Sequence, residues 1–271
     1  MVGEATPTWR LLETGPRPGA WNMACDVAVL EAVGRRASPP TVRFYAWDPP
    51  AVSLGRHQPD PDQRSRAVLE ELGVEWVRRP TGGRLVHHGP MGEELTYSVV
   101  AAVGEAPLSG GLTDAYRRIH EGLAAGLERL GLAVELARRA PGRPARVTPT
   151  SRLACFASTV PWEIEAGNRK LLGSAQRRSR RALLQHGSLP LAGDPGAIPE
   201  RVWPGSFAGR AVTTVSAAAG RTIGFADVVA ALRVGLEETL NVFLSPGVLT
   251  DHERAAVRAG CRTRVPTPAS A

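Results

Sequence analysis

The sequence is almost free of lysine. Of its 33 basic residues, 32 are arginines and one, Lys170, is a lysine. Arginine is planar and permanently charged, whereas lysine carries a compact ammonium group with a movable pKa, so the two are not interchangeable where chemistry depends on the cation. Lysine-dependent chemistry is therefore excluded everywhere except at Lys170. The alternative is that the composition has shifted toward arginine in general and that Lys170 has remained a lysine by chance.

Cysteine is also scarce, with Cys25, Cys155 and Cys261 lying far apart in the chain. Three is an odd number, and no C-x-x-C or Cys/His pair has metal-ligand spacing, which argues against a disulfide framework or a zinc site. We therefore expect no metal, and any cysteine that matters acts as a thiol. Cys25 falls in a predicted helix, where a small packed residue is expected.

Long hydrophobic runs are absent as well. No segment approaches the ~18 apolar residues of a membrane span, and the N-terminus lacks the features of a signal peptide. We expect a soluble, cytoplasmic protein with no membrane partner.

The net charge of +7 would suit the binding of nucleic acid. However, the arginines are scattered and no nucleic-acid-binding motif accompanies them, so no such partner is expected. A basic surface would equally suit acidic carrier proteins.

With 271 residues, 43% of them hydrophobic, the chain can form one large domain. Hydrophobic periodicity predicts helices over 21–33, 60–73, 113–130 and 225–240, and strands over 41–47, 51–55, 74–80, 85–88, 94–103, 160–166, 169–177 and 182–191. Asp60 and Thr113 are the expected N-caps of two of the helices. Strands and helices without strict alternation indicate an α+β domain with a mixed β-sheet flanked by helices. We assign this domain to residues 8–245 and expect residues 246–271 to be a peripheral tail.

A TGGR loop follows the predicted strand over 74–80. Without Cβ atoms, Gly82 and Gly83 allow the backbone to approach a thin ligand, and Arg79 could hold a phosphate or a carboxylate. Paired glycines mark tight turns at least as often as ligand contacts, so this loop alone is a weak signal.

Cys155 precedes a predicted hairpin whose turn is Gly167-Asn168. On the strand after that turn, alternation places Lys170 and Ser174 on one face. If Lys170 approached Cys155, the cation would lower the pKa of the thiol and favour the nucleophilic thiolate. These residues alone favour a packed Cys155 over a catalytic one, because free cysteines are usually buried and inert.

Three groups of segments carry a family resemblance. They are PPAVSLGRHQ; VRRPTGGRLVHH followed by ELTYSV; and ACFAS with GNRKLLGSAQRR and LLQHGSLPL. Over roughly residues 8 to 245, these segments resemble the biotin/lipoate protein ligase superfamily, most closely its cysteine-dependent octanoyltransferase branch. The most specific part is the separation of fifteen positions between Cys155 and Lys170, where Lys170 opens K-x-x-G-S-A-Q-R-R.

The resemblance implies a biotin/lipoate protein ligase-like catalytic domain and the activity of an octanoyl-acyl carrier protein:protein N-octanoyltransferase in lipoate biosynthesis. It implies that Cys155 takes octanoate from acyl carrier protein as a thioester and passes it to a lysine of a lipoyl domain or of the glycine cleavage H protein. Lys170 would lower the pKa of Cys155 and contact the acyl carbonyl. The residues expected to line the acyl site are Arg79, Thr81, Gly82, Gly83, Gly173, Ser174 and Ala175. The reaction needs no metal and no cofactor.

The chain also departs from the family pattern. Many relatives have a histidine-aspartate turn where this chain has His87, His88 and GPMGE, so we expect a structural role for both histidines. The same expectation holds for His57, His120, His186 and His252. The glycine loop reads GGR and not the GGG of ATP-dependent lipoate ligases, which favours the transferase.

The alternatives are an ATP-dependent lipoate ligase, an octanoyl amidotransferase acting between lipoyl domains, and a non-catalytic binder of acyl groups or nucleic acid. The sequence leaves open the acyl chain length, the acceptor and the oligomeric state.

Overall fold

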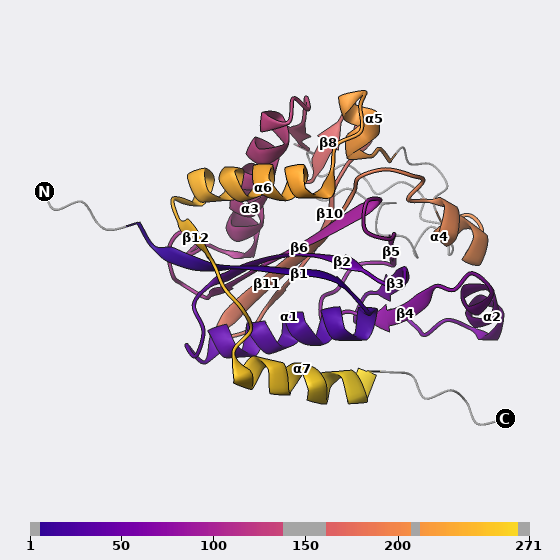
Figure 1. The fold of residues 1–271 in the computed structure, drawn as a ribbon, viewed down its shortest axis with the longest axis horizontal. Coiled ribbons are helices and arrows are strands. Elements are labelled where there is room, and N and C mark those ends of the chain that lie inside the picture. Colours follow the sequence, from indigo (N-terminus) through magenta and orange to yellow (C-terminus); the bar gives the residue numbers. More distant parts are fainter. Residues whose placement is uncertain (1–5, 138–160, 207–211, 265–271) are drawn as a thin grey trace, which may run out of the picture.

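The computed structural model describes residues 6–137, 161–206 and 212–264, and a six-stranded sheet forms its centre (Figure 1). In spatial order, the strands are β10 (Gly173–Arg178), β11 (Ala182–Pro190), β6 (Glu94–Ala102), β2 (Thr41–Trp47), β1 (Thr8–Arg17) and β12 (Phe243–Pro246). β1 pairs in parallel with β2 and β12, whereas the pairs from β2 through β6 and β11 to β10 are antiparallel. The predicted α+β class with a mixed sheet is confirmed.

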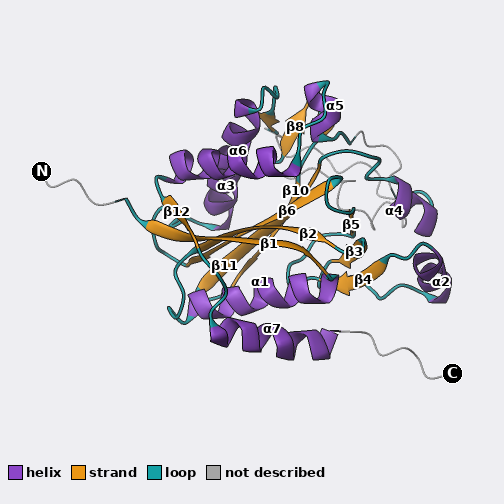
Figure 2. Cartoon of the chain, in the orientation of Figure 1, coloured by secondary structure: helices purple, strands orange, loops and turns teal. Residues whose placement is uncertain are grey.

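Helices cover both faces of this sheet (Figure 2). On one face lie α1 (Gly19–Gly34) and α7 (Asp251–Arg264); on the other lie α3 (Leu112–Arg129) and α6 (Phe225–Leu240). The central strands β2 and β6 are buried at every position because both of their faces are covered. Polar residues on these strands therefore lie in the interior, where they need hydrogen-bonding partners.

Glycines allow α3 and α6 to pack in close contact. A Cβ atom on Gly126 would lie 2.7 Å from the Ala231 carbonyl oxygen, and one on Gly235 would overlap the Gly122 carbonyl oxygen. Only residues without a side chain fit at these positions. The contact fixes α3 against the rest of the domain, and α3 carries a buried histidine of the candidate site.

Two three-stranded sheets lie beside the large one. The first has the order β4 (Glu75–Arg78), β3 (Ala51–Leu54), β5 (Val86–His88), and the second has the order β7 (Glu135–Leu136), β8 (Ile164–Ala166), β9 (Arg169–Lys170). The remaining helices are α2 (Gln63–Glu71), α4 (Ala197–Val202) and α5 (Val215–Ala219).

The two predicted N-caps are wrong. α2 is capped by Asp62, whose side chain accepts a hydrogen bond from the Ser65 N–H at 2.8 Å, whereas Asp60 pairs with Arg78. α3 begins at Leu112, so Thr113 lies inside its first turn, and the Asp114 carboxylate accepts from the Gly111 N–H at 2.9 Å. The N-cap of α2 is therefore Asp62 and that of α3 is Gly111, whose N–H the third helical residue, Asp114, satisfies.

The predicted hairpin is confirmed, because β8 pairs with β9 and both Gly167 and Asn168 adopt positive φ angles. The strand predicted over 169–177 is wrong in one respect: it breaks at Leu171 and Leu172, whose N–H groups both donate to the Ile164 carbonyl oxygen. Lys170 and Ser174 consequently belong to different sheets.

The segment after residue 245, which we expected to be a peripheral tail, completes β12 and forms α7. The Arg10 guanidinium on β1 donates to both carboxylate oxygens of Glu253 on α7, at 2.7 and 2.8 Å, and the Glu253 side chain is fully buried. Val257 of α7 packs against α1. In the described part of the chain, no helix is long and apolar enough to cross a membrane.

Candidate active site

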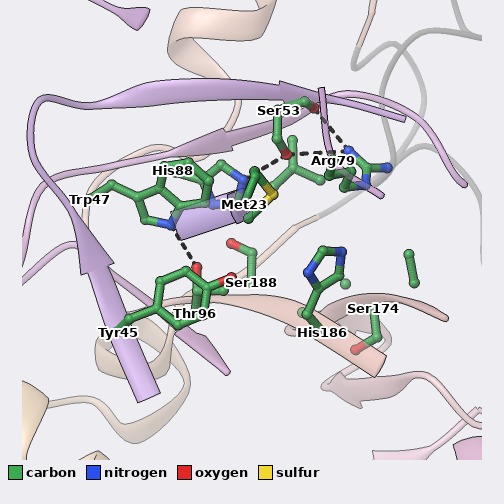
Figure 3. A pocket seen from close by; sticks show the side chains of 14 residues that line it. Met23, Tyr45, Trp47, Ser53, Arg79, His88, Thr96, Ser174, His186 and Ser188 are labelled. Carbon is green, nitrogen blue, oxygen red and sulfur yellow. Dashed lines mark hydrogen bonds between the residues drawn. The ribbon is translucent and has the colours of Figure 1, made fainter. Parts of the chain in front are cut away.

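A small cavity lies against the α1 side of the large sheet (Figure 3). Its walls come from α1, from four strands of the large sheet and from β3 and β5 of the neighbouring sheet. The lining residues are Met23, Tyr45, Trp47, Ser53, Arg79, Val86, His88, Thr96, Gly173, Ser174, Ala175, His186, Gly187 and Ser188.

Four of the residues predicted for an acyl site line this cavity: Arg79, Gly173, Ser174 and Ala175. The Arg79 guanidinium bonds to the loop that follows it. Its Nη2 donates to the Gly82 carbonyl oxygen at 2.8 Å and also to the Arg84 carbonyl, and its Nη1 donates to the Ser53 carbonyl oxygen at 2.9 Å. Arg79 thereby determines the shape of the TGGR loop.

The loop glycines have different environments. Gly83 has a φ of +88°, and a Cβ atom on Gly55 would overlap its carbonyl oxygen, so the loop packs directly on a second glycine. A Cβ atom on Gly82 would meet nothing within 4 Å. Neither Gly82, Gly83 nor Thr81 lines the described cavity. Their role in acyl binding stays a prediction, and the open space beside Gly82 is compatible with it.

A charged group of side chains lies under the cavity, between α1 and the sheet. We name it the α1-face cluster: Asp26, Arg43, Tyr45, Ser98 and His186. Asp26 accepts from Arg43 at 2.8 Å, from Tyr45 at 3.0 Å, from Ser98 at 3.1 Å and from Nδ1 of His186 at 2.8 Å. Burial alone would raise the pKa of Asp26, but the His186 hydrogen bond and the Arg43 charge together hold it below its ordinary value.

His186 connects this cluster to the TGGR loop. Its Nε2 lies 2.7 Å from the hydroxyl oxygen of Thr81, which is buried in the wall of the domain. Thr81, predicted to line the acyl site, therefore anchors the loop to the ring of a cavity-lining histidine.

A second chain of hydrogen bonds forms the wall beside His88, whose ring stacks on Trp47 at 3.9 Å (Figure 3). His88 Nε2 lies 2.8 Å from the Ser53 hydroxyl, and its Nδ1 lies 3.3 Å from Glu94. Thr96 donates to Glu94 at 2.6 Å and accepts from Trp47 at 2.8 Å. These polar groups are therefore paired with one another, except that Glu94 Oε2 and the Ser188 hydroxyl have no hydrogen-bond partner among the described residues.

Burial determines the protonation of this wall. It raises the pKa of Glu94 to about 8, an effect that the Thr96 hydrogen bond opposes in part. It also lowers the pKa of His88 well below its usual value, and the nearby Arg79 charge adds to this decrease. At neutral pH, His88 is therefore a neutral imidazole and Glu94 is a protonated carboxylic acid.

A third group lies on the opposite face of the sheet, beneath α3. We name it the α3-face cluster: Tyr97, His120, Ser174 and Gln185. The Ser174 hydroxyl lies 2.8 Å from both Tyr97 Oη and His120 Nε2, and Gln185 donates to Tyr97 Oη at 2.9 Å. A Cβ atom on Gly187 would lie 2.6 Å from Tyr97 Cε1, so glycine is required for this close packing. The cluster fixes Ser174 at the start of β10.

Lys170 is fully buried and forms an ion pair with Glu163, with Nζ 2.6 Å from Oε1. The pair lies at the β8–β9 hairpin, three residues before the cavity-lining Gly173. Cys155, the predicted nucleophile, lies outside the described residues. The predicted meeting of Cys155 and Lys170 therefore stays a prediction.

Sequence reasoning did not single out Asp26 or Glu163, and it expected His88, His120 and His186 to be structural. A signal for Asp26 and His186 was present: each is a polar residue within a mostly apolar helix or strand. Such residues, when buried, require specific partners. Glu163 carried no comparable signal, because it directly precedes a short strand that contains a second glutamate, Glu165.

The Lipoyl protein ligase A/B catalytic domain family matches residues 18–237, and the chain belongs to this family.

Several similar proteins are named octanoyltransferase LipM. The one from Symbiobacterium thermophilum is 41% identical, over 90% of this chain and 91% of the relative; the one from Kyrpidia tusciae is 40% identical, over 91% and 92%.

Solved structures share the fold. A lipoate-protein ligase A bound with ATP has a TM-score of 0.72 at 23% identity, covering 95% of both chains. A bi-partite lipoate protein ligase from Thermoplasma acidophilum has a TM-score of 0.71 at 21% identity, covering 94% of this chain and 92% of that one.

Proposed function

We propose that this protein is an octanoyltransferase that moves octanoate from octanoyl-acyl carrier protein to a lysine of a lipoyl domain or glycine cleavage H protein, through a thioester on Cys155. The relatives named octanoyltransferase support the acyl group and the reaction class. The observation that carries the proposal is Lys170, the single lysine of the chain, buried and ion-paired immediately before the cavity-lining Gly173, Ser174 and Ala175.

The lining of the cavity suits a nonpolar chain. Its free interior of about 20 Å³ holds roughly one water molecule, so the wall must widen before an octanoyl chain can enter. The polar edges of Trp47, His88 and Thr96 are hydrogen-bonded within the wall, so the rings and methyl groups are left for contact with the ligand.

The reaction proceeds in two transfers. In the first, the Cys155 thiolate attacks the octanoyl thioester carbonyl, the new C–S bond forms, and the carrier leaves as a thiolate that takes up a proton. In the second, the neutral amine of the acceptor lysine attacks the Cys155 thioester. The amide C–N bond forms, the C–S bond breaks, the nitrogen loses a proton and the Cys155 thiolate is restored.

Lys170 has two roles in this proposal. Its positive charge lowers the pKa of the Cys155 thiol, which increases the thiolate fraction. Its ammonium also donates to the acyl carbonyl oxygen, which becomes more negative in each tetrahedral intermediate. Glu163 holds the ammonium in place until the substrate arrives.

Intact-mass spectrometry after incubation with octanoyl-acyl carrier protein tests the thioester. We expect an octanoyl adduct on the wild-type protein that hydroxylamine removes, and no adduct on the folded Cys155→Ala variant. Transfer from the isolated adduct to an apo lipoyl domain then completes the reaction. A wild-type protein that never acquires the adduct would refute the proposal.

The same assay separates the alternative enzymes. An ATP-dependent ligase would modify an apo lipoyl domain with free lipoate and ATP, and the Cys155→Ala variant would retain that activity. An amidotransferase would form the Cys155 adduct from an octanoylated lipoyl domain faster than from octanoyl-acyl carrier protein.

A further inference from the structure

Trp162, the residue before Glu163, has a strained backbone. Its φ is +71°, a left-handed conformation that bulky residues rarely adopt. Strain of this kind persists where the surrounding structure enforces it, and it concentrates at functional sites. Here the N–H of Trp162 donates to the Ala137 carbonyl oxygen at 2.9 Å, and its own carbonyl points to α3.

His120 of α3 accounts for the direction of that carbonyl. Its Nδ1 lies 2.6 Å from the Trp162 carbonyl oxygen, and because a carbonyl can only accept, Nδ1 carries the hydrogen. Burial lowers the pKa of His120 to about 4, with the Trp162 bond opposing this decrease and the Lys170 charge adding to it. The ring is therefore neutral, and its Nε2 accepts from the Ser174 hydroxyl at 2.8 Å.

His120 thus bonds to both segments that flank Lys170 in the chain. On one side is Trp162, followed by Glu163, the ion-pair partner of Lys170; on the other is Ser174, which lines the cavity. The ring itself is completely buried and packs edge-on against Tyr116 at 4.1 Å. No part of it lines the cavity.

We propose that His120 is a positioning residue: by bonding to Trp162 and Ser174 at once, it sets the distance between the Lys170–Glu163 pair and the acyl group in the cavity. This inference rests on the proposed function. Displacement of a catalytic group by about 1 Å costs up to ~100-fold in rate, which is why a residue that touches no reacting atom can control turnover.

Two substitutions remove one link each. His120→Asn keeps a donor near the position of Nδ1 but cannot reach Ser174, and His120→Gln keeps an acceptor near the position of Nε2 but loses Trp162. We expect each to lower kcat by at least about tenfold while KM for octanoyl-acyl carrier protein changes less than about threefold. Ile119→Val, which removes one buried methylene from the neighbouring position, is the control for a purely structural loss: it lowers Tm and leaves kcat unchanged.

A spectroscopic measurement does not depend on activity. In the ¹⁵N-histidine spectrum, we expect the ring whose signals are lost in both His120 variants to be in the Nδ1–H tautomer and not to titrate above pH 5. Wild-type kcat in both His120 variants, or a protonated Nε2 on this ring, would overturn the inference. If neither variant folds, Ser174→Ala breaks one link alone, and unchanged kcat in that variant counts equally against it. A wild-type protein without transfer activity would instead refute the proposed function and leave the tautomer as predicted.

Discussion

The two faces of the large sheet carry polar clusters of opposite character, although alternate residues of the same strands supply both. Ser98 and His186 point toward α1, and their neighbours Tyr97 and Gln185 point toward α3. The α1-face cluster contains a buried carboxylate and a buried guanidinium, whereas the α3-face cluster consists of hydroxyl, amide and imidazole groups. The first supports the cavity and its loop, and the second supports the segment that contains Lys170.

This difference predicts different consequences of substitution. Removal of one member of a buried ion pair leaves an uncompensated charge, which is strongly destabilising. Removal of one neutral hydrogen bond costs only about 1 kcal/mol of folding free energy. Changes in the charged α1-face cluster should therefore act mainly on stability, and changes in the neutral α3-face cluster should act mainly on catalysis.

Lys170→Arg tests the catalytic side of the comparison and should have the largest effect. Arginine keeps the charge, but its larger planar head does not fit a fully buried site that holds an ammonium 2.6 Å from Glu163. We expect octanoyl transfer to fall roughly 10³-fold, comparable to the loss of a transition-state hydrogen-bond donor.

The matched control for Lys170→Arg is the reverse substitution, Arg43→Lys, in the α1-face cluster. It should lower Tm and leave kcat per folded molecule close to the wild-type value. Equal kcat for Lys170→Arg and the wild-type protein would show that the solitary lysine is incidental.

Asp26→Asn tests the stability side. The amide cannot neutralise Arg43, so we expect the free energy of unfolding to fall by about 3 kcal/mol at pH 7, measured by urea denaturation. Because the folded state lowers the pKa of Asp26, this carboxylate contributes stability above its ordinary pKa and loses the contribution as pH falls through the folded value.

The difference in the free energy of unfolding between Asp26→Asn and the wild-type protein should accordingly become smaller at acidic pH. Ser98→Ala, which removes a neutral partner of the same carboxylate, should cost about 1 kcal/mol. If Asp26→Asn costs no more than Ser98→Ala, the charge of the cluster is unimportant for folding.

Regular patterns made much of the fold predictable. The apolar stripe of α3 and the alternation in the buried strands specify which faces enter the core. The break at Leu171 and Leu172 could not be predicted, because two leucines are compatible with an uninterrupted strand. The strand ends there because the Ile164 carbonyl oxygen accepts hydrogen bonds from the N–H groups of both leucines.

The site was predictable where a motif is local and unpredictable where it depends on distant partners. The run from Lys170 to Ala175 is contiguous, and three of its predicted residues, Gly173, Ser174 and Ala175, line the cavity. By contrast, Asp26 meets His186 across 160 positions, and His120 meets Ser174 across 54. No spacing rule relates such residues before the sheet brings them together.

Glu94→Gln removes the ionisable carboxyl group from the cavity wall but keeps its hydrogen bond, so it tests the contribution of ionisation alone. The folded state raises the pKa of Glu94 to about 8, so its contribution to stability is complete below the ordinary value near 4.5 and is lost as pH rises toward 8. We expect wild-type stability to fall by roughly 1 kcal/mol per pH unit within that interval from this group.

Glutamine keeps the oxygen that accepts from Thr96, so the variant should show a flatter dependence on pH. Urea denaturation at pH 5.5 and 7.5 measures the difference. If the free energy of unfolding changes with pH in the same way for Glu94→Gln and the wild-type protein, Glu94 is ionised in the folded state.

Thr81→Val has the smallest expected effect and links the α1-face cluster to substrate binding. Valine has nearly the same shape as threonine but cannot bond to His186, so the TGGR loop loses its anchor without a change of volume. The expected cost is about 1 kcal/mol, seen as a roughly fivefold increase in KM for octanoyl-acyl carrier protein with kcat nearly unchanged. Thr81→Ser keeps the hydroxyl and should restore KM. If KM is unchanged in Thr81→Val and raised in Thr81→Ser, the methyl group rather than the hydroxyl of Thr81 matters for substrate binding, and the loop needs no anchor from the α1 face.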